Sequence, residues 1–267
     1  MKRLPAVAGQ FYPANRSSLQ RQLEGFCTVS PGMPIPYGII SPHAGYIYSG
    51  AIAGKLFSTI TVPDRVILLG PNHHGLGHPG AVSTVDAWET PLGDIPVDPV
   101  LSEAILDSCR HFGADEKAHR SEHSLEVQVP FLQFFNSAAS FVPVCIGNLS
   151  LDALVESGES LADVISGYGE SILIIASSDM THFESAEEAR RKDFLALRHV
   201  EQLDAEGLYR TVSQNRISMC GVLPSVVMLA AARKLGATKG EVVAYGTSGE
   251  VTGDDRDVVA YAGVVVN

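Results

Sequence analysis

The sequence predicts one α/β domain, with a mixed and mostly parallel central β-sheet flanked by helices on both faces. Three short apolar runs, at residues 38–41, 65–70 and 171–177, carry this prediction because each is rich in Ile, Val and Leu. Unbroken apolar runs of this kind are typical of parallel strands that are buried on both faces. They alternate with amphipathic segments long enough to be helices, which is the pattern of a sheet with helical crossovers.

The other elements follow in order along the chain. Strands are predicted at residues 38–41, 65–70, 81–85, 141–146, 171–177, 241–245 and 257–266. Helices are predicted at residues 16–26, 50–58, 99–110, 123–136, 151–167, 186–205 and 221–235. No internal repeat, low-complexity tract or charged linker divides the chain, so residues 1–267 are expected to form one domain.

Local signals refine three of these elements. Pro130 lies inside the helix predicted at 123–136, and it should kink that helix or start a second helical piece, because proline lacks the amide proton. Gly236 directly follows the helix predicted at 221–235 and is a good helix stop. A glycine-rich segment joins the last two strands, which could therefore pair antiparallel.

Charge and composition exclude several classes of function. The net charge is −11 and there is no basic run, which argues against nucleic acid and anionic membranes as partners. No stretch reaches the roughly 18 apolar residues that a membrane span needs, and the N-terminal residues do not resemble a signal peptide. The four cysteines show no metal-finger or disulfide spacing, which favours a reducing compartment. We therefore expect a soluble, cytoplasmic protein.

Two of the apolar runs end in proline followed by histidine. Ser41-Pro42-His43 follows the first run, and Gly70-Pro71-Asn72-His73-His74 follows the second. Open α/β sheets build their sites at the carboxyl ends of strands, so His43 and His73 are candidate site residues. His74 would point to the other side of an extended segment. Each histidine taken alone could also be a loop residue that is hydrogen-bonded to backbone.

Further candidates follow the third run and precede a predicted helix. Asp179 and His182 are three residues apart, so they would share one face if a helix started here. Asp179 could instead cap that helix. His123 also lies at a predicted helix start, where it could donate a proton at the edge of a site or simply cap the helix.

Cys220 directly precedes the helix predicted at 221–235. A thiol at a helix N-terminus is expected to have a lowered pKa, because the helix dipole and the unpaired N–H groups favour the thiolate. Cys220 could equally be a small buried apolar residue, as we expect for the other three cysteines.

Taken jointly, these groups are typical ligands of Fe, Zn and Cu. His43 and His73 could hold an ion with Cys220 or with Asp179, and either triad would leave coordination positions open. A cysteine-dependent hydrolase, with Cys220 as nucleophile and His182 as base, is another possible arrangement. No Gly-x-Gly-x-x-Gly motif follows a predicted strand, so nothing indicates a dinucleotide site.

These segments, with several others, resemble the Memo (mediator of cell motility) family over almost the whole chain. The motifs that carry the resemblance are Pro5-Ala6-Val7-Ala8-Gly9-Gln10-Phe11-Tyr12-Pro13, Pro42-His43-Ala44-Gly45-Tyr46-Ile47-Tyr48-Ser49-Gly50, Gly70-Pro71-Asn72-His73-His74, Thr90-Pro91-Leu92-Gly93-Asp94, Glu122-His123-Ser124-Leu125-Glu126, Ser177-Ser178-Asp179-Met180-Thr181-His182 and Cys220-Gly221. So many short motifs in one order make the resemblance specific.

The family is similar in fold to class III extradiol ring-cleaving dioxygenases, non-haem Fe(II) enzymes that hold iron with two histidines and a carboxylate. The resemblance implies that His43 and His73 are metal ligands and that Cys220 replaces the carboxylate. It also implies a set of pocket residues: His182 as the acid/base histidine, His123 as a second and distal one, Asp179 completing the pocket, and Phe11 and Tyr48 on an aromatic rim.

The resemblance further implies a cofactor, an activity and partners. Fe(II) is the expected metal, with Cu or Zn as alternatives, because thiolate is a softer ligand than carboxylate. The expected activity is that of a redox or oxygenase-like enzyme, or of a metal-handling protein, acting on a small molecule or peptide. The alternative is a binding module whose pocket receives a phosphopeptide or a small anion, as implicated in animal members. Microbial genes of this kind resemble one member of a set that also encodes a radical-SAM protein, so partners from that pathway are expected.

Overall fold

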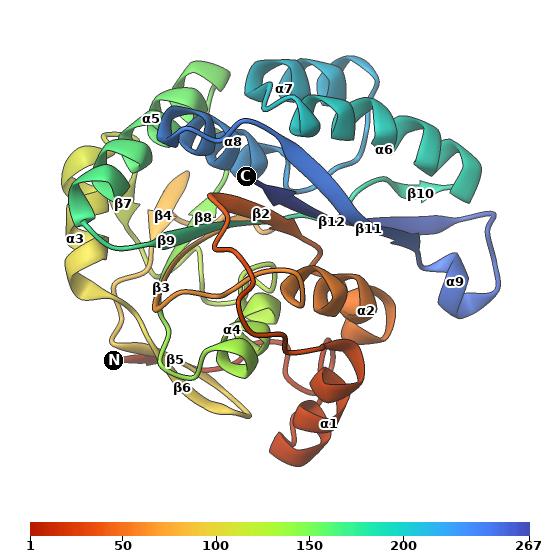
Figure 1. Cartoon of the computed structure of the whole chain (residues 1–267), viewed down its shortest axis with the longest axis horizontal. Helices are drawn as coiled ribbons and strands as arrows, with labels where there is room; N and C mark the ends of the chain where they lie inside the picture. The colour runs from red at the N-terminus through yellow and green to blue at the C-terminus, as the bar shows by residue number, and fades with distance from the viewer.

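A nine-stranded mixed β-sheet runs through the centre of the molecule, in a computed structural model that describes residues 1–267 (Figure 1). Strands β2, β9, β3 and β8 are parallel neighbours at its middle, and antiparallel pairs join β12 to β2 and β4 to β8. The strands of this sheet are β2 (Gly38–Ser41), β3 (Arg65–Pro71), β4 (Gly80–Val82), β7 (Gly113–Ala114), β8 (Ser140–Ile146), β9 (Ile172–Ser177), β10 (His182–Glu184), β11 (Gly240–Thr247) and β12 (Val258–Val266). A smaller sheet contains β1 (Lys2–Arg3), β5 (Ala87–Thr90) and β6 (Gly93–Pro96).

Helices cover both faces of the central sheet (Figure 1). One face packs against α3 (Pro99–Ser108), α5 (Leu151–Tyr168), α6 (Ala186–Glu201), α7 (Ala205–Gln214) and α8 (Val222–Leu235). The other packs against α1 (Arg16–Phe26), α2 (Tyr46–Phe57) and α4 (Val129–Phe135), the last preceded by a 3₁₀ turn at Glu126–Gln128. The two faces bury apolar clusters of 40 and 29 residues, which explains why the central strands are apolar throughout. The predicted α/β class is thus confirmed.

The last two strands, β11 and β12, form the antiparallel pair that their glycine-rich connection suggested. The short helix α9 (Gly249–Thr252) lies in that connection. Pro130 lies in the first turn of α4, so it begins a second helical piece, and His123 lies before both pieces. None of the helices combines the length and the apolar composition that crossing a membrane requires.

The helix predicted at 186–205 is wrong at its end. The chain leaves α6 after Glu201 and starts α7 at Ala205, a helix that the sequence pattern did not reveal. Leu203 adopts the left-handed region, with φ of +55°. The side chain of Asp204 then caps α7 by accepting from the N–H of Gly207. Apolar periodicity continues across this joint, and it therefore could not show the break.

No helix starts near Asp179, which was the condition for Asp179 and His182 to share a helix face. Residues 178–181 have no regular structure, and His182 begins β10, which pairs antiparallel with β12. The carboxylate of Asp179 caps no helix, because it accepts the backbone N–H groups of His43 and Ala44 at 2.7 and 3.3 Å. Asp179 and His182 therefore do not share a helix face.

Candidate metal centre

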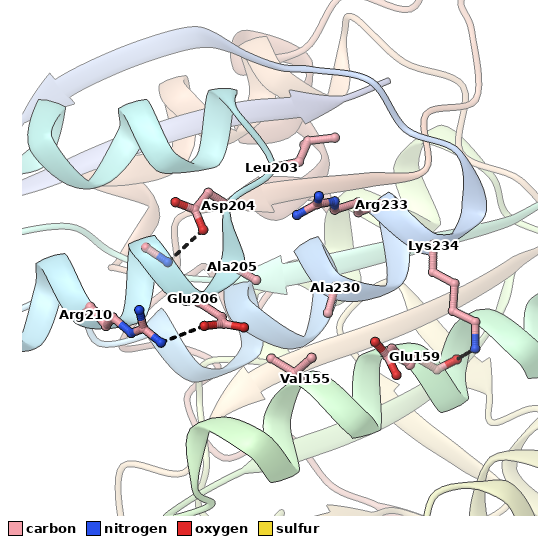
Figure 2. Close-up of a pocket in the computed structure, with 11 residues that line it drawn as sticks. Val155, Glu159, Leu203, Asp204, Ala205, Glu206, Arg210, Ala230, Arg233 and Lys234 are labelled. Atoms are coloured by element: carbon pink, nitrogen blue, oxygen red, sulfur yellow. Dashed lines mark hydrogen bonds and ion pairs between the residues drawn. The ribbon is translucent and has the colours of Figure 1, made fainter.

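A cavity of about 540 Å³ lies between α5, α7 and α8 (Figure 2). Two of its charged side chains pair with each other, Arg210 with Glu206 at 2.7 Å, and Lys234 donates to the backbone carbonyl of Glu159 at 3.2 Å. No histidine, cysteine, serine or threonine lines it. This cavity therefore lacks the imidazole and thiol groups that a transition-metal site needs, and the candidate metal centre lies elsewhere.

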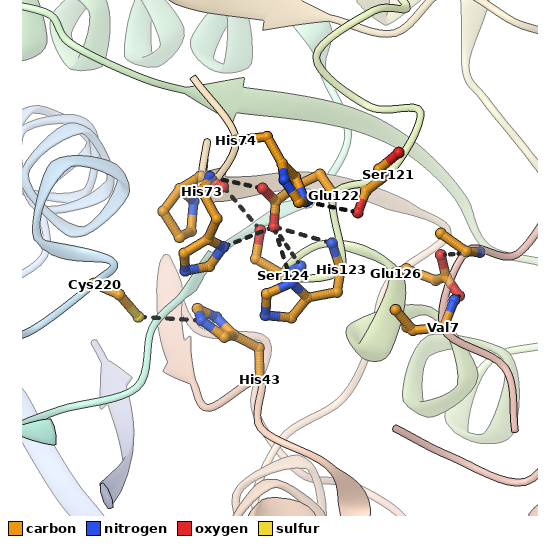
Figure 3. Close-up of polar contacts among 12 residues, drawn as sticks. Val7, His43, His73, His74, Ser121, Glu122, His123, Ser124, Glu126 and Cys220 are labelled. Carbon is orange, nitrogen blue, oxygen red and sulfur yellow. Dashed lines mark hydrogen bonds and ion pairs between the residues drawn. The ribbon is translucent and has the colours of Figure 1, made fainter. Parts of the chain in front are cut away.

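Imidazoles and a thiol converge at the carboxyl ends of β2 and β3 (Figure 3). Both strands run parallel to β9, so His43 and His73, which follow them, reach the same edge of the sheet. Their ring centroids lie 5.2 Å apart and their planes are nearly perpendicular, at 82°. Cys220, in the loop before α8, places its Sγ 3.1 Å from Nε2 of His43. Cys220 thus contacts His43, and His43 lies beside His73, but Cys220 is not among the side chains that line the pocket, nor in the group of donors that all lie within one ion's reach.

A buried serine fixes the tautomer of His43. The hydroxyl of Ser177 donates to the backbone carbonyl of Ser124 at 2.6 Å, so its oxygen must accept from Nδ1–H of His43, 2.9 Å away. Gln128 also donates to this oxygen, at 2.9 Å. The lone pair of His43 is therefore on Nε2, the nitrogen that faces Cys220. Burial holds the pKa of His43 well below its usual range, so the ring is neutral and able to bind an ion.

A buried carboxylate fixes the tautomer of His73. Oε1 of Glu122 lies 2.8 Å from Nδ1 of His73. Glu122 also accepts the backbone N–H groups of His73, His123 and Ser124, at 2.7, 3.0 and 2.9 Å. Burial alone would raise the pKa of Glu122, but the hydrogen bond from His73 and these backbone donors hold it well below its usual range. The ionised carboxylate keeps the proton of His73 on Nδ1 and leaves Nε2 free for an ion.

His123 stacks on His73, with ring centroids 4.6 Å apart and planes only 14° from parallel. Donor atoms of His43, His73 and His123 all lie within 4.8 Å of one another, a spacing at which one ion could be held. The nitrogen lone pair of an imidazole lies in the ring plane, so two stacked parallel rings cannot both direct it at one ion. The perpendicular rings of His43 and His73 can. Burial lowers the pKa of His123 to about 4, so its ring is neutral at pH 7.

The expected activation of Cys220 by a helix N-terminus is wrong. Burial, together with the carboxylate of Asp179, raises the pKa of the Cys220 thiol instead. The helix α8 begins only at Val222. The backbone N–H of Asp179 donates to Sγ at 3.3 Å, and this bond does not outweigh the loss of solvent. The imidazole that contacts the thiol belongs to His43, not to His182 as the hydrolase arrangement requires.

His182 and Asp179 line the same pocket as the three histidines. Nδ1 of His182 lies 3.0 Å from the carbonyl oxygen of Ser218, so it carries the proton and leaves Nε2 able to accept one. Asp179 is only 4% exposed, and burial raises its pKa. Its carboxylate holds the backbone of the His43 loop, and it does not belong to the converging donor set.

The pocket has a volume of about 510 Å³ and no lysine or arginine lines it. Phe11 and Tyr48, expected on an aromatic rim, both line it, and Tyr261 adds a third aromatic ring. The remaining lining residues are His43, Ala44, Gly45, His73, His123, Asp179, His182, Ser248, Thr252 and Val259. The pocket therefore combines imidazoles with aromatic walls and contains one carboxylate.

Sequence reasoning missed the residues that support the ligands, namely Glu122, Ser177, Gln128 and Ser218. Glu122 stands next to His123 in the sequence, and an acidic residue beside a candidate histidine was a usable signal. Ser177 is the last residue of β9, and nothing in the sequence distinguishes it from other strand serines.

Comparisons with known proteins match the chain over its length. A family model described as "Memo-like protein" matches residues 3–265. A MEMO1 family protein of Aquifex aeolicus is 45% identical over 265 residues, covering 98% of both chains. The MEMO1 family protein MK0963 of Methanopyrus kandleri is 39% identical over 281 residues, covering 99% of both. The uncharacterized protein JW3007 of Escherichia coli K12 is similar in fold, with a TM-score of 0.53, 14% identity, and coverage of 85% of this chain and 98% of that one.

Proposed function

The chain belongs to the Memo family, and from this premise we propose that it is a metal-dependent redox enzyme with one ion held by His43, His73 and Cys220. One observation carries the proposal. Two imidazoles lie beside each other, each with its Nδ1 engaged by a buried acceptor, and a thiol lies 3.1 Å from Nε2 of one of them, His43.

The donor set fits a transition metal. Nitrogen and sulfur ligands bind such ions at roughly 2.0–2.1 and 2.3 Å, which separates the donor atoms by about 3.1–3.6 Å depending on the angle at the ion. Sγ of Cys220 and Nε2 of His43 are 3.1 Å apart, at the short end of that range. The stacking of His123 on His73 supports the thiol as third ligand, because His123 would first have to turn its ring. Two imidazoles and a thiolate suit Fe(II), the metal that we favour, and also Cu or Zn.

The surrounding residues have distinct parts in this proposal. A bound iron or copper ion would supply a redox centre with an open position for an organic substrate. His182 would accept or return a substrate proton at Nε2, since its Nδ1 proton is engaged by Ser218. His123 would remain a neutral hydrogen-bonding group beside the substrate, and Phe11 and Tyr48 would exclude water from it.

Two alternatives receive less support. A pocket for phosphopeptides or small anions would need cationic side chains, and no lysine or arginine lines this one. A cysteine hydrolase would need a thiol of lowered pKa beside its base, whereas the pKa of Cys220 is raised by burial.

Anaerobic reconstitution with Fe(II), Cu(I) and Zn(II), followed by elemental analysis, tests the proposal. We expect about one ion per chain in the wild type, because the site is mononuclear. His73→Ala and Cys220→Ser should each lose most of it. His74→Ala is the matched control, because His74 is the exposed neighbour whose ring is bonded to the Ser121 carbonyl. Equal metal content in wild type and His73→Ala would end the proposal.

A further inference from the structure

Large apolar side chains are exposed around the mouth of the histidine pocket. Tyr48 lines this pocket and is itself exposed. His182 and Thr252 also line it, and each is next in sequence to an exposed apolar residue, Phe183 and Val251 respectively. The resulting mouth patch consists of Ile47, Tyr48, Phe183 and Val251, which are 65%, 39%, 78% and 48% exposed. Their elements α2, β10 and α9 lie on the same side of the molecule (Figure 1). Apolar side chains gathered beside a pocket, unlike single scattered ones, typically mark an interaction site.

Phe183 has an unusual backbone for an exposed aromatic residue. Its φ is +61°, in the left-handed region that bulky side chains rarely adopt. The register of β10 against β12 shifts between His182 and Glu184, with Phe183 between them. This irregularity leaves His182 lining the pocket while the ring of Phe183 projects into solvent. Glycine or asparagine would fit this backbone better, so folding alone does not favour a phenylalanine here.

The charges at the mouth are predominantly negative. The segment from α9 to β12 carries four carboxylates, those of Glu250, Asp254, Asp255 and Asp257, and one cation, Arg256. Arg256 is already paired with Asp254 at 2.7 Å. The pocket behind this segment contains no lysine or arginine, and the whole chain has a net charge of −11. A cationic partner is therefore attracted to the mouth, and an anionic membrane or a second copy of this chain is repelled.

We propose that the mouth patch is a docking surface for a polypeptide segment that presents an apolar or aromatic side chain beside lysine or arginine. The apolar side chain packs on Phe183 and Tyr48, and the cation is attracted by Asp255 and Asp257. This docking goes beyond the proposed metal chemistry and does not require a bound ion, so the two proposals can fail separately.

Fluorescence anisotropy of labelled peptides, on the full chain in excess chelator, tests this. The probes are the hexapeptide Lys-Phe-Lys-Leu-Lys-Phe and its acidic counterpart Glu-Phe-Glu-Leu-Glu-Phe. We expect the basic peptide to bind at least about tenfold more tightly than the acidic one, and less tightly as salt is added. Comparable binding of the acidic peptide would overturn the proposal.

Matched variants locate the binding. Phe183→Asn should lower the affinity for the basic peptide by about fivefold or more, by analogy with aromatic hot spots. The melting temperature of this variant should stay level or rise, because asparagine tolerates the left-handed backbone. Asp257→Asn should lower the affinity for the basic peptide by about twofold and make that affinity less dependent on salt. Val100→Asn and Asp107→Asn, exposed positions on α3, should leave binding unchanged. Binding that survives Phe183→Asn, or that falls equally in the α3 controls, would contradict a mouth patch.

Discussion

The carboxylate of Glu122 lies 2.8 Å from Nδ1 of His73, and the Glu122 side chain is entirely shielded from water. A buried carboxylate bonded to the outer nitrogen of a ligating histidine orients the ring and makes its other nitrogen a better donor.

Glu122→Gln should weaken metal binding. The amide removes the negative charge and offers only one acceptor oxygen to the donors that surround Glu122, so the ring of His73 loses its fixed orientation. We expect the dissociation constant for Zn(II), measured by competition with a chelating dye, to rise by about 10- to 100-fold. Glu126→Gln is the control, because Glu126 is a buried acid of the same segment that binds Arg3 and Tyr12 rather than a histidine. An equal loss of affinity in both variants would mean that only the fold had been damaged.

Cys220→Ser should change which ion the site prefers. Thiolate is a soft ligand and hydroxyl is a hard one, so affinity for Cu(I) should fall further than affinity for Zn(II), by at least about tenfold. Competition titrations of both ions in the absence of oxygen measure this difference. Cys27→Ser should have no effect, because Cys27 directly follows α1, whereas Cys220 is the cysteine whose Sγ contacts His43. An unchanged ratio of the two affinities in Cys220→Ser would exclude sulfur as a ligand.

His119 should make the fold sensitive to acid. It is fully buried, its Nε2 donates to the carbonyl of Ala81 at 3.0 Å, and burial lowers its pKa to about 4. An unfolded chain protonates histidine below pH 6.5, so between pH 6.5 and 4 the unfolded state binds the additional proton. The free energy of unfolding should therefore decrease as the pH is lowered from 6.5 to 4, and His119 should account for up to about 3 kcal/mol of that decrease.

Urea unfolding at several pH values, with chelator present, measures this acid sensitivity. His119→Gln should show a shallower loss of stability between pH 6.5 and 4 than the wild type, even if it is less stable at pH 7. Parallel pH profiles for the two proteins would refute the assignment to His119.

Gly221→Ala should displace Cys220. A Cβ at Gly221 would lie 2.3 Å from the carbonyl oxygen of Ser177 and 2.3 Å from the Cβ of Ser178, too close for either to stay in place. We expect a loss of about 1–3 kcal/mol in the free energy of unfolding, and weaker metal binding in the protein that remains folded. Gly167→Ala is the control, since nothing lies within 4 Å of its Cβ position and alanine suits a helix, here the last turn of α5. If Gly221→Ala were as stable as Gly167→Ala, the close packing at this loop would be disproved.

The sequence contained enough information to bring His43 and His73 together but not to predict the residues that support them. His43 and His73 follow apolar runs that form β2 and β3, and both strands pair in parallel with β9, which places their carboxyl ends at the same edge of the sheet, so local pattern and topology sufficed. Glu122 reaches His73 from 49 positions away, and Ser177 reaches His43 from 134 positions away. Such pairings depend on how loops pack, which hydrophobic periodicity does not encode. The same limit explains the error at Leu203, where a single left-handed residue separates two helices of similar pattern.

The absence of lysine and arginine from the histidine pocket has a consequence for regulation. Asp179 is the only acidic side chain among the lining residues, so a divalent ion bound by the histidines and the Cys220 thiolate would cancel the negative charge of the cavity. The metal supply of the cell would then determine which molecules the protein accepts, since cations favour the metal-free form and the loaded form loses that preference.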